Sequence, residues 1–209
     1  MNYLATTLMS IFPLYEAFIC FTNLVLGNAK DRSLLYSMYT FDVERISAYN
    51  KIFNKLLDHY SPDLFELLET HSINSQVYTL PWWYTLYSNS LQLDKTLAVW
   101  DIMLIFGDIS IIKFGVFLLM DLQEKMQDEI RQNGYIDIRA IIEEADIGRV
   151  IRKVVESQDI AGKISGKIGL VLNGKIGNML GVKGRNIDFG DLNQWVLGEI
   201  LSHREEKER

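Results

Sequence analysis

Apolar residues recur at helical spacing along most of the chain and predict consecutive helices over residues 1–130. The clearest stretch is 41–59 and its end, where positions on one side return at steps of three and four residues: Val43, Ile46, Tyr49 or Asn50, Phe53, Leu56 or Leu57, and Tyr60. Residues 2–11 and 15–25 are apolar on most faces, which is typical of buried helices. No strand pattern competes before residue 130, so we predict an all-α fold.

Capping and turn residues predict where these helices begin and end. Serine, aspartate and first-turn proline favour helix starts, whereas glycine favours helix ends. The expected starts are Ser61 with Pro62 before 63–71, Asp94 before 95–106 and Ser110 before 111–126, and the expected ends are Gly27-Asn28 and Gly107. We expect Pro81 to begin or kink its helix, because proline cannot donate an interior hydrogen bond.

The pattern changes near Asn133. Residues 135–157 still show helical periodicity, and the residues expected on one side are Ile138, Ile141, Ile142, Ala145, Val150 and Val154. Residues 160–187, in contrast, contain seven of the fourteen glycines, five basic residues and no acidic residue. Apolar positions in 160–187 fit a helix, although each interior glycine costs a helix about 1 kcal/mol. Asn173-Gly174 instead favours a hairpin turn, so both conformations stay open. We divide the chain into a helical domain, 1–130, and an extension, 131–209, that ends in a charged tail.

Composition and charge exclude several classes of protein. The net charge of −6 and pI near 5.1 argue against nucleic acid as the main partner, because phosphate binding requires a basic face. One cysteine, Cys20, and three separated histidines predict neither an internal disulfide nor a metal site. Residues 1–26 contain no Lys or Arg, and Pro13 and Glu16 interrupt them, so we expect neither a signal peptide nor a membrane span. We expect no cofactor.

Three of the four tryptophans lie in residues 80–101, "LPWWYTLYSNSLQLDKTLAVWD". Helical spacing places Trp82, Leu86, Leu97 and Trp100 on buried faces. Aromatic stripes of this kind are far more often core than the lining of a ligand site. We therefore interpret the stretch as interior packing.

The order of residues from 65 to 123 carries more information, and it resembles the second half of a TBC domain, the fold of GTPase-activating proteins for Rab-type small GTPases. The matching positions are Ser72-Ile73, Tyr78, Trp82, Leu86-Tyr87-Ser88, Leu91-Gln92, Trp100-Asp101 and Lys113-Phe114. The departures are Ser72 for a glycine, Gln92 for a proline, and Ala98-Val99 for an arginine followed by Ile or Leu. Met1-Asn2 and Glu16-Ala17-Phe18 extend the resemblance, which covers 1–128 and implies part of a multi-helix orthogonal bundle.

The resemblance implies regulation of Rab-type GTPases in vesicle traffic, in the cytoplasm, with peripheral contact to endomembranes as an open alternative. TBC proteins supply an arginine from Ile-x-x-Asp-x-x-Arg and a glutamine from Tyr-x-Gln, and both motifs precede the position matched by Met1-Asn2. We therefore predict a protein impaired or inactive as an activator and assign no catalytic residue. The substitutes considered, namely Arg32, Glu44, Arg45, Gln76 and Gln92, are interpreted as ordinary surface or loop residues. We also expect apolar surface to lie open along 1–21, which would favour self-association.

Two alternatives stay open beside impaired activation. The chain is either a non-catalytic binding module, or a helical protein that contacts membranes through 160–187, where Lys163, Lys167 and Lys175 partly fit an amphipathic helix. A glycine-lined helix packed on the domain is the interpretation we prefer for that segment. We expect no enzyme in its own right, since no nucleophile-elbow or phosphate-loop pattern occurs.

Overall fold

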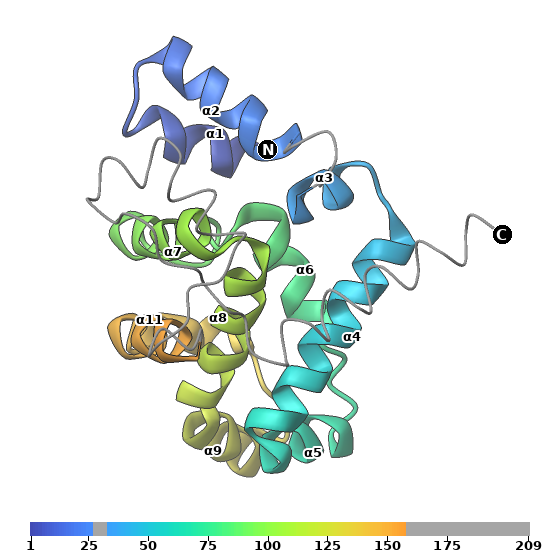
Figure 1. Ribbon diagram of the computed structural model, residues 1–209. Coiled ribbons are helices and arrows are strands. Elements are labelled where there is room, and N and C mark those ends of the chain that lie inside the picture. Colours follow the sequence, from blue (N-terminus) through green and yellow to red (C-terminus); the bar gives the residue numbers. More distant parts are fainter. Residues whose placement is uncertain (27–32, 158–209) are drawn as a thin grey trace, which may run out of the picture. The chain divides into compact units, whose positions relative to one another are not determined.

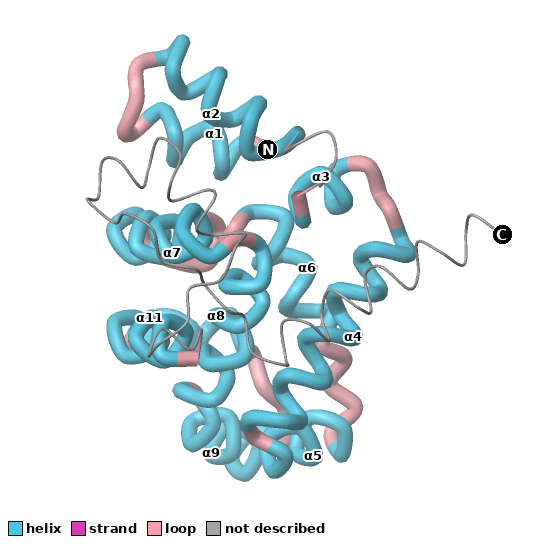
Figure 2. The backbone as a smooth tube through the Cα atoms, viewed as in Figure 1, coloured by secondary structure: helices cyan, strands magenta, loops and turns pink. Residues whose placement is uncertain are grey.

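The computed structural model describes residues 1–26 and 33–157, and every regular element within those ranges is a helix (Figure 1, Figure 2). The elements are α1 (Asn2–Met9), α2 (Leu14–Leu26), α3 (Leu34–Tyr39), α4 (Val43–Tyr60), α5 (Pro62–Thr70), α6 (Gln76–Thr85), α7 (Leu93–Phe106), α8 (Asp108–Asp121), α9 (Gln123–Asn133), α10 (Ile138–Ile141), the 3-10 helix η1 (Ile142–Glu144) and α11 (Ile147–Glu156). The predicted all-α fold is confirmed for this part of the chain. The glycine-rich segment 160–187, Gly27-Asn28 and the charged tail lie outside the described residues.

The chain divides into a compact unit, Met1–Ile151, and a second unit that begins at Arg152, within α11. The first unit is organised around α8, which packs against α4, α7 and α9 (Figure 1). Ten of its fourteen residues are buried. Helix α4 also packs against α3 and α5, so α8 and α4 together form the interior of this unit.

The junction between α7 and α8 differs from the prediction. Helix α7 begins after Gln92, so Asp94 lies within its first turn and not at the cap. Gly107 adopts φ +76°, which favours glycine, and the chain turns there within a single residue. Helix α8 therefore begins at Asp108, and Ser110 is buried inside it with its hydroxyl donating to the Gly107 carbonyl at 2.7 Å. The predicted helix 111–126 is instead divided between α8 and α9.

Pro81 lies inside α6 and does not begin it. Proline is unfavourable in a helix interior because it removes one backbone hydrogen bond. Helix α6 extends only four residues past it and ends at Leu86, which has φ +45°. Of the two alternatives predicted for Pro81, a helix start is wrong, because the preceding residues from Gln76 onward already form the first turns. The other alternative, a kink at Pro81, stays a prediction.

Helix α3 was not predicted from the sequence. Ser33 caps this helix, since its hydroxyl accepts a hydrogen bond from the Tyr36 backbone N–H at 3.1 Å. The Asp108 carboxylate accepts a second hydrogen bond, from the Leu34 backbone N–H, at 2.5 Å. Leu34, Leu35 and Met38 are buried. A serine followed by apolar residues at these positions was a signal available in the sequence.

Residues 135–157 form three short elements and not one helix. Ala145 is extended, with ψ 139°, and this breaks the helix between η1 and α11. The Asp146 carboxylate accepts a hydrogen bond from the Arg149 backbone N–H at 3.0 Å and so caps α11. The residues that were expected on one side of the helix are nevertheless buried, namely Ile138, Ile141, Ile142, Ala145, Val150 and Val154.

Helices α1 and α2 are less buried than their apolar pattern predicted. Only Ala17 is buried in α2, and only Leu4, Thr7 and Leu8 are buried in α1. The two helices pack against each other, and α2 also packs against α3, so most of their surface has no interior to face (Figure 1). The prediction of a buried helix pair was therefore wrong, whereas the prediction of open apolar surface along 1–21 is confirmed.

Candidate functional site

The tryptophan-rich stretch folds into the interior of the first unit. Trp82, Trp83, Leu86, Tyr87 and Trp100 are all buried, which confirms that they are interior packing. The ring of Trp82 is tilted against those of Tyr78 and Tyr87, and the ring of Trp83 lies edge-on to Phe53, arrangements that are favourable for aromatic pairs. Leu97, which was expected to be buried, is half-exposed, and the neighbouring Thr96 and Val99 are buried in α7.

A left-handed turn connects α6 to this interior. Leu86 and Tyr87, in the Leu-Tyr-Ser triplet, both have positive φ, at 45° and 66°. Such backbone is unfavourable for L residues and persists only where the surroundings hold it. The Trp100 indole N–H donates to the Leu86 carbonyl at 2.9 Å, so a side chain of α7 holds the turn of α6. The triplet and the Trp-Asp pair thus form one structural unit.

Tyr87 extends from this turn to α8. Its hydroxyl donates to the Ile111 carbonyl at 3.1 Å, and its ring lies edge-on to Phe114 at 4.8 Å between centroids. Burial raises the pKa of Tyr87 well above its ordinary value, so the phenol stays protonated and can donate. A Cβ at Gly115 would lie 2.7 Å from the Tyr87 hydroxyl, so only glycine leaves room for this side chain.

Polar side chains also fix α6 against α4. The Asn50 side-chain oxygen accepts hydrogen bonds from the hydroxyls of Ser75 at 3.2 Å and Thr79 at 3.3 Å, and all three residues are buried. Buried polar groups cost free energy unless they are paired. These bonds therefore fix the position of α6, which carries Trp82 and Trp83, against α4. The periodicity of 41–59 had indicated this position only as Tyr49/Asn50, without its partners.

Lys113 is a buried cation in α8. Its side chain is 1% exposed, and burial lowers its pKa to about 8. Phe114, its partner in the Lys-Phe pair, is fully buried as well. With this pKa the lysine is mostly charged at pH 7, and the burial of that charge lowers the free energy of unfolding. Hydropathy patterning alone would have placed it on the surface.

At two matched positions the family has glycine and proline, whereas this chain has Ser72 and Gln92. The backbone angles at both positions nevertheless suit the residues of the family. Ser72 has φ +55°, and the Ile73 N–H donates to the Leu68 carbonyl at 2.9 Å, which closes α5 in a Schellman motif. Glycine is favoured at that position. Gln92 has φ −63°, a value that proline adopts. The backbone at these two sites thus agrees with the resemblance although the side chains differ.

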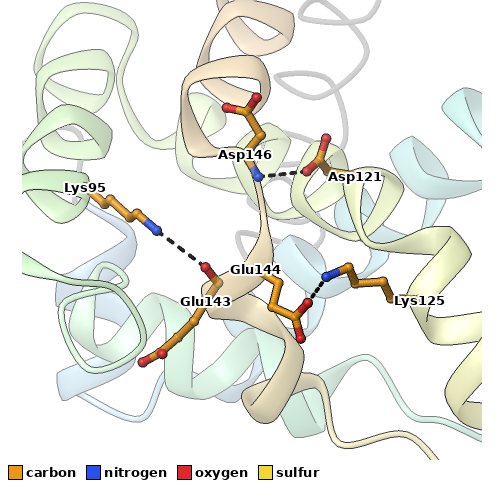
Figure 3. A network of polar contacts seen from close by, with 6 residues as sticks. All are labelled: Lys95, Asp121, Lys125, Glu143, Glu144 and Asp146. Atoms are coloured by element: carbon orange, nitrogen blue, oxygen red, sulfur yellow. Dashed lines mark hydrogen bonds and ion pairs between the residues drawn. The ribbon is translucent and has the colours of Figure 1, made fainter.

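A polar network ties η1 to three helices of the same unit (Figure 3). The Asp121 carboxylate, at the end of α8, accepts a hydrogen bond from the Asp146 backbone N–H at 3.0 Å. Lys95 of α7 donates to the Glu143 carbonyl at 3.4 Å, and Lys125 of α9 pairs with Glu144 (Figure 3). Residues 142–146 are therefore anchored to the domain by backbone and side-chain contacts alike.

Arg149 strengthens the same junction. Its Nε lies 2.5 Å from the Asp121 carboxylate, which is almost completely buried. The hydrogen bond that Arg149 donates to that carboxylate, together with the negative charge of the carboxylate, raises the pKa of Arg149. This contact was not predicted from the sequence. Its available signal was Asp146-x-x-Arg149, where the aspartate caps a helix and the arginine follows in the first turn.

The residues considered as substitutes for an activating arginine or glutamine are not brought together in the described part of the chain. Arg45 is half-buried in the first turn of α4, where its backbone N–H donates to the capping Asp42 carboxylate at 3.2 Å. Gln76 is exposed at the start of α6, and Gln92 is exposed before α7. Arg32 lies outside the described residues. Their roles stay predictions.

Within residues 1–26 and 33–157, no group of three His, Cys, Asp or Glu side chains could hold a metal ion. Among the described helices, none has both the length and the apolar character needed to cross a membrane.

The part of the chain that carries these features also matches a known family. The family model of the Rab-GTPase-TBC domain matches residues 1–127. TBC1 domain family member 14 of Rattus norvegicus is 26% identical over 102 residues, which are 49% of this chain and 14% of that protein. TBC1 domain family member 12 of Xenopus tropicalis is 28% identical over 102 residues, with the same coverage of 49% and 14%.

A third relative is the putative mitotic check point protein BUB2 of Dictyostelium discoideum, which is 27% identical over 107 residues, or 51% of this chain and 27% of that protein. The chain thus spans about one seventh of the length of the TBC1 relatives it matches. No solved structure gives a significant match.

Proposed function

The chain belongs to the Rab-GTPase-TBC domain family, and from this membership we propose that it regulates a Rab-type small GTPase by binding it, with impaired or absent acceleration of GTP hydrolysis. The observation that carries the proposal is the family match over residues 1–127 together with the ordered positions inside it. Trp82, Leu86, Tyr87 and Trp100 all take part in one hydrogen-bonded and aromatic interior. This interior supports a folded scaffold of the family type.

The chemistry of the reaction supports the second half of the proposal. GTPases hydrolyse GTP slowly until an arginine neutralises charge on the transferring phosphoryl group, an effect of about 10³- to 10⁵-fold in rate. Neither Ile-x-x-Asp-x-x-Arg nor Tyr-x-Gln occurs in the 209 residues. Asp-x-x-Arg alone occurs at Asp42, Asp128 and Asp146. The first and third of these aspartates cap helices, which gives them a structural task.

The test is a panel of GTP-loaded Rab proteins with two readouts, binding to the immobilised chain and the rate of phosphate release. We expect saturable binding of at least one Rab protein in its GTP form, with a release rate within about twofold of the intrinsic one, since the large factor needs a supplied arginine. Robust stimulation of release would contradict the impaired activity, and no binding across the panel would contradict the proposal as a whole.

Two arginine variants make the test specific. Arg45→Ala removes the half-buried arginine of α4, and Arg131→Ala is its matched control, because Arg131 also follows an aspartate by three residues and is exposed on α9. We expect neither variant to change phosphate release. A stimulated rate that only Arg45→Ala abolishes would identify Arg45 as the supplied arginine and overturn its assignment as a surface residue.

We place the binding of a Rab-type GTPase in the cytoplasm, at the surface of endomembranes where Rab proteins reside. We assign residues 1–130 to the TBC-like part of the chain and residues 131–209 to an extension. Flotation with phosphatidylcholine and phosphatidylserine vesicles tests the membrane alternative for residues 160–187. If the intact chain floats and a chain lacking 160–187 does not, the segment contacts membranes; if neither floats, that alternative is excluded.

A further inference from the structure

The strap is the name we give to residues 138–151, which comprise α10, η1 and the first half of α11. It lies beyond residues 1–127, the part that matches the family model. The strap consists of short helical pieces, and Ala145 is extended between η1 and α11, so the strap has little stability of its own. Its apolar side chains are nevertheless buried, namely Ile138, Ile141, Ile142, Ala145, Ile147 and Val150. Contacts with other elements therefore hold the strap in place.

Two exposed polar contacts connect the strap to α7 and α9 (Figure 3). Lys95 of α7 donates to the Glu143 carbonyl at 3.4 Å, which is long for a hydrogen bond. Lys125 of α9 pairs with Glu144, and these two side chains are 44% and 56% exposed. Water and salt screen pairs of this kind, so each contributes little to stability. These two contacts orient the strap and do not decide whether it stays closed.

Asp121, the last residue of α8, makes the contact that is shielded from water. Its side chain is 3% exposed, and its carboxylate lies 2.5 Å from the Nε of Arg149. The same carboxylate accepts a hydrogen bond from the Asp146 backbone N–H at 3.0 Å (Figure 3). A nearly buried carboxylate is costly unless a cation and hydrogen-bond donors pair with it. Both of these partners belong to the strap, so the charge of Asp121 favours the closed strap.

Gly134 supplies a hinge on the N-terminal side of the strap. It ends α9 with φ +74°, a conformation that favours glycine. Apart from its chain neighbours, no atom of the described residues lies within 4 Å of the position that a Cβ would take there. Residues 131–135 are exposed, so the connection between α9 and the strap contributes little packing. The strap can therefore swing on this glycine without disturbing α9.

We infer that the strap opens as one body about Gly134 and that the ion pair of Asp121 with Arg149 is the latch that keeps it closed. The anchors lie on α7, α8 and α9, so opening does not require α4 or α6 to unfold. Local opening of such a unit costs less free energy than global unfolding. An open strap uncovers the Asp121 carboxylate together with the apolar surface that the strap had buried, so one side of the unit changes from covered to accessible. The inference does not depend on the proposed regulation of a GTPase.

Amide hydrogen exchange of the full 209-residue chain, followed by NMR, tests the inference. The reporters are the Asp146 amide, which donates to Asp121, and the Val150 amide, which donates to the Asp146 carbonyl at 3.0 Å. Arg149→Gln leaves Asp121 without its cation, and we expect both amides to exchange at least about tenfold faster. The amides of α4 should keep their exchange rates, which would show that the rest of the unit stays folded.

Asp121→Asn combined with Arg149→Gln separates a latch from a merely structural role. Removing both charges leaves no unpaired ion behind, so the double variant should recover most of the lost protection. Arg131→Gln is the matched control, because Arg131 pairs with Asp128 on the surface of α9, where the two side chains are 75% and 62% exposed. This variant should change no exchange rate.

Unchanged exchange of the Asp146 and Val150 amides in Arg149→Gln would overturn the inference. An equal acceleration of the α4 amides would also overturn it, because the strap would then not open separately from the rest of the unit. A double variant that exchanges as fast as Arg149→Gln alone would show that the ion pair is not the latch.

Discussion

Helices α2 and α8 have nearly the same apolar content and opposite environments. Ten of the thirteen residues of α2 are apolar, as are nine of the fourteen residues of α8 if glycine is not counted. Yet α8 buries ten residues and α2 buries only Ala17. Helix α8 has packing partners on several sides, in α4, α7 and α9, whereas α2 packs mainly against α1 and α3. Apolar composition therefore indicates that a helix can be buried, and neighbouring elements decide whether it is.

The largest difference in stability is expected between two leucine-to-alanine substitutions, one in α8 and one in α2. Leu118→Ala in α8 should lower the free energy of unfolding by about 2 to 5 kcal/mol, because Leu118 is fully buried and its removal leaves a cavity. Leu14→Ala in α2 should change it by less than about 0.5 kcal/mol in the monomer, because Leu14 is 75% exposed. Urea unfolding of both variants measures the difference. Equal costs would contradict the contrast between the helices.

A smaller effect tests how tightly α8 is packed. Gly115→Ala should destabilise by about 1 to 3 kcal/mol, since the added Cβ would meet the Tyr87 hydroxyl at 2.7 Å and Phe53 at 3.1 Å. Tyr87→Phe removes that hydroxyl, so the double variant should lose less stability than the two single variants added together. A double-mutant cycle from urea unfolding measures the coupling. Strict additivity would show that Tyr87 is not the side chain that requires glycine here.

The buried lysine of α8 should make stability depend on pH. The folded-state pKa of Lys113 is about 8, and that of lysine in an unfolded chain is about 10.4. Between these values the unfolded chain binds a proton that the folded chain does not, so the free energy of unfolding should rise from pH 8 to 9.5, by about 1 to 2 kcal/mol. Thermal unfolding across this range measures the rise, which Lys113→Met should abolish.

Lys51→Met is the control for that experiment, because Lys51 is an exposed lysine on α4. It should leave the dependence unchanged. Above pH 10 the trend should reverse, since burial raises the pKa values of Tyr78 and Tyr87 and the unfolded chain then loses protons that the folded chain keeps. A stability that is flat from pH 8 to 9.5 in the parent chain would contradict the assignment to Lys113.

The smallest expected effect is an increase in the free energy of unfolding at Ser72, which is exposed. Ser72→Gly should raise the free energy of unfolding by about 1 kcal/mol, because Ser72 has φ +55° and glycine adopts this backbone without a clash. Ser72→Ala is the control and should give no such gain, since alanine keeps the Cβ. The change in melting temperature of the two variants measures the difference, and an equal response would show that the backbone angle is not the cause.

Much of the fold could be predicted from local pattern, and the corrections cluster where tertiary contacts act. The periodicity of 41–59 correctly predicted α4, because an amphipathic stripe is written in the order of its own residues. The start of α8 at Asp108 could not be predicted, since it follows from the turn at Gly107 and from how Ser110 fits against α7. Helix α3 depends similarly on a distant carboxylate, that of Asp108.

For the candidate site, the sequence by itself determined the family, the order of its matched residues and the interior role of the tryptophans, because these depend on residue type and spacing. Only the tertiary structure decided that Lys113 is buried, that Asp121 anchors Arg149 and Asp146, and that α2 is left open. The physical reason is that burial and pairing belong to two or more elements at once. The pattern of any one helix does not contain its neighbours.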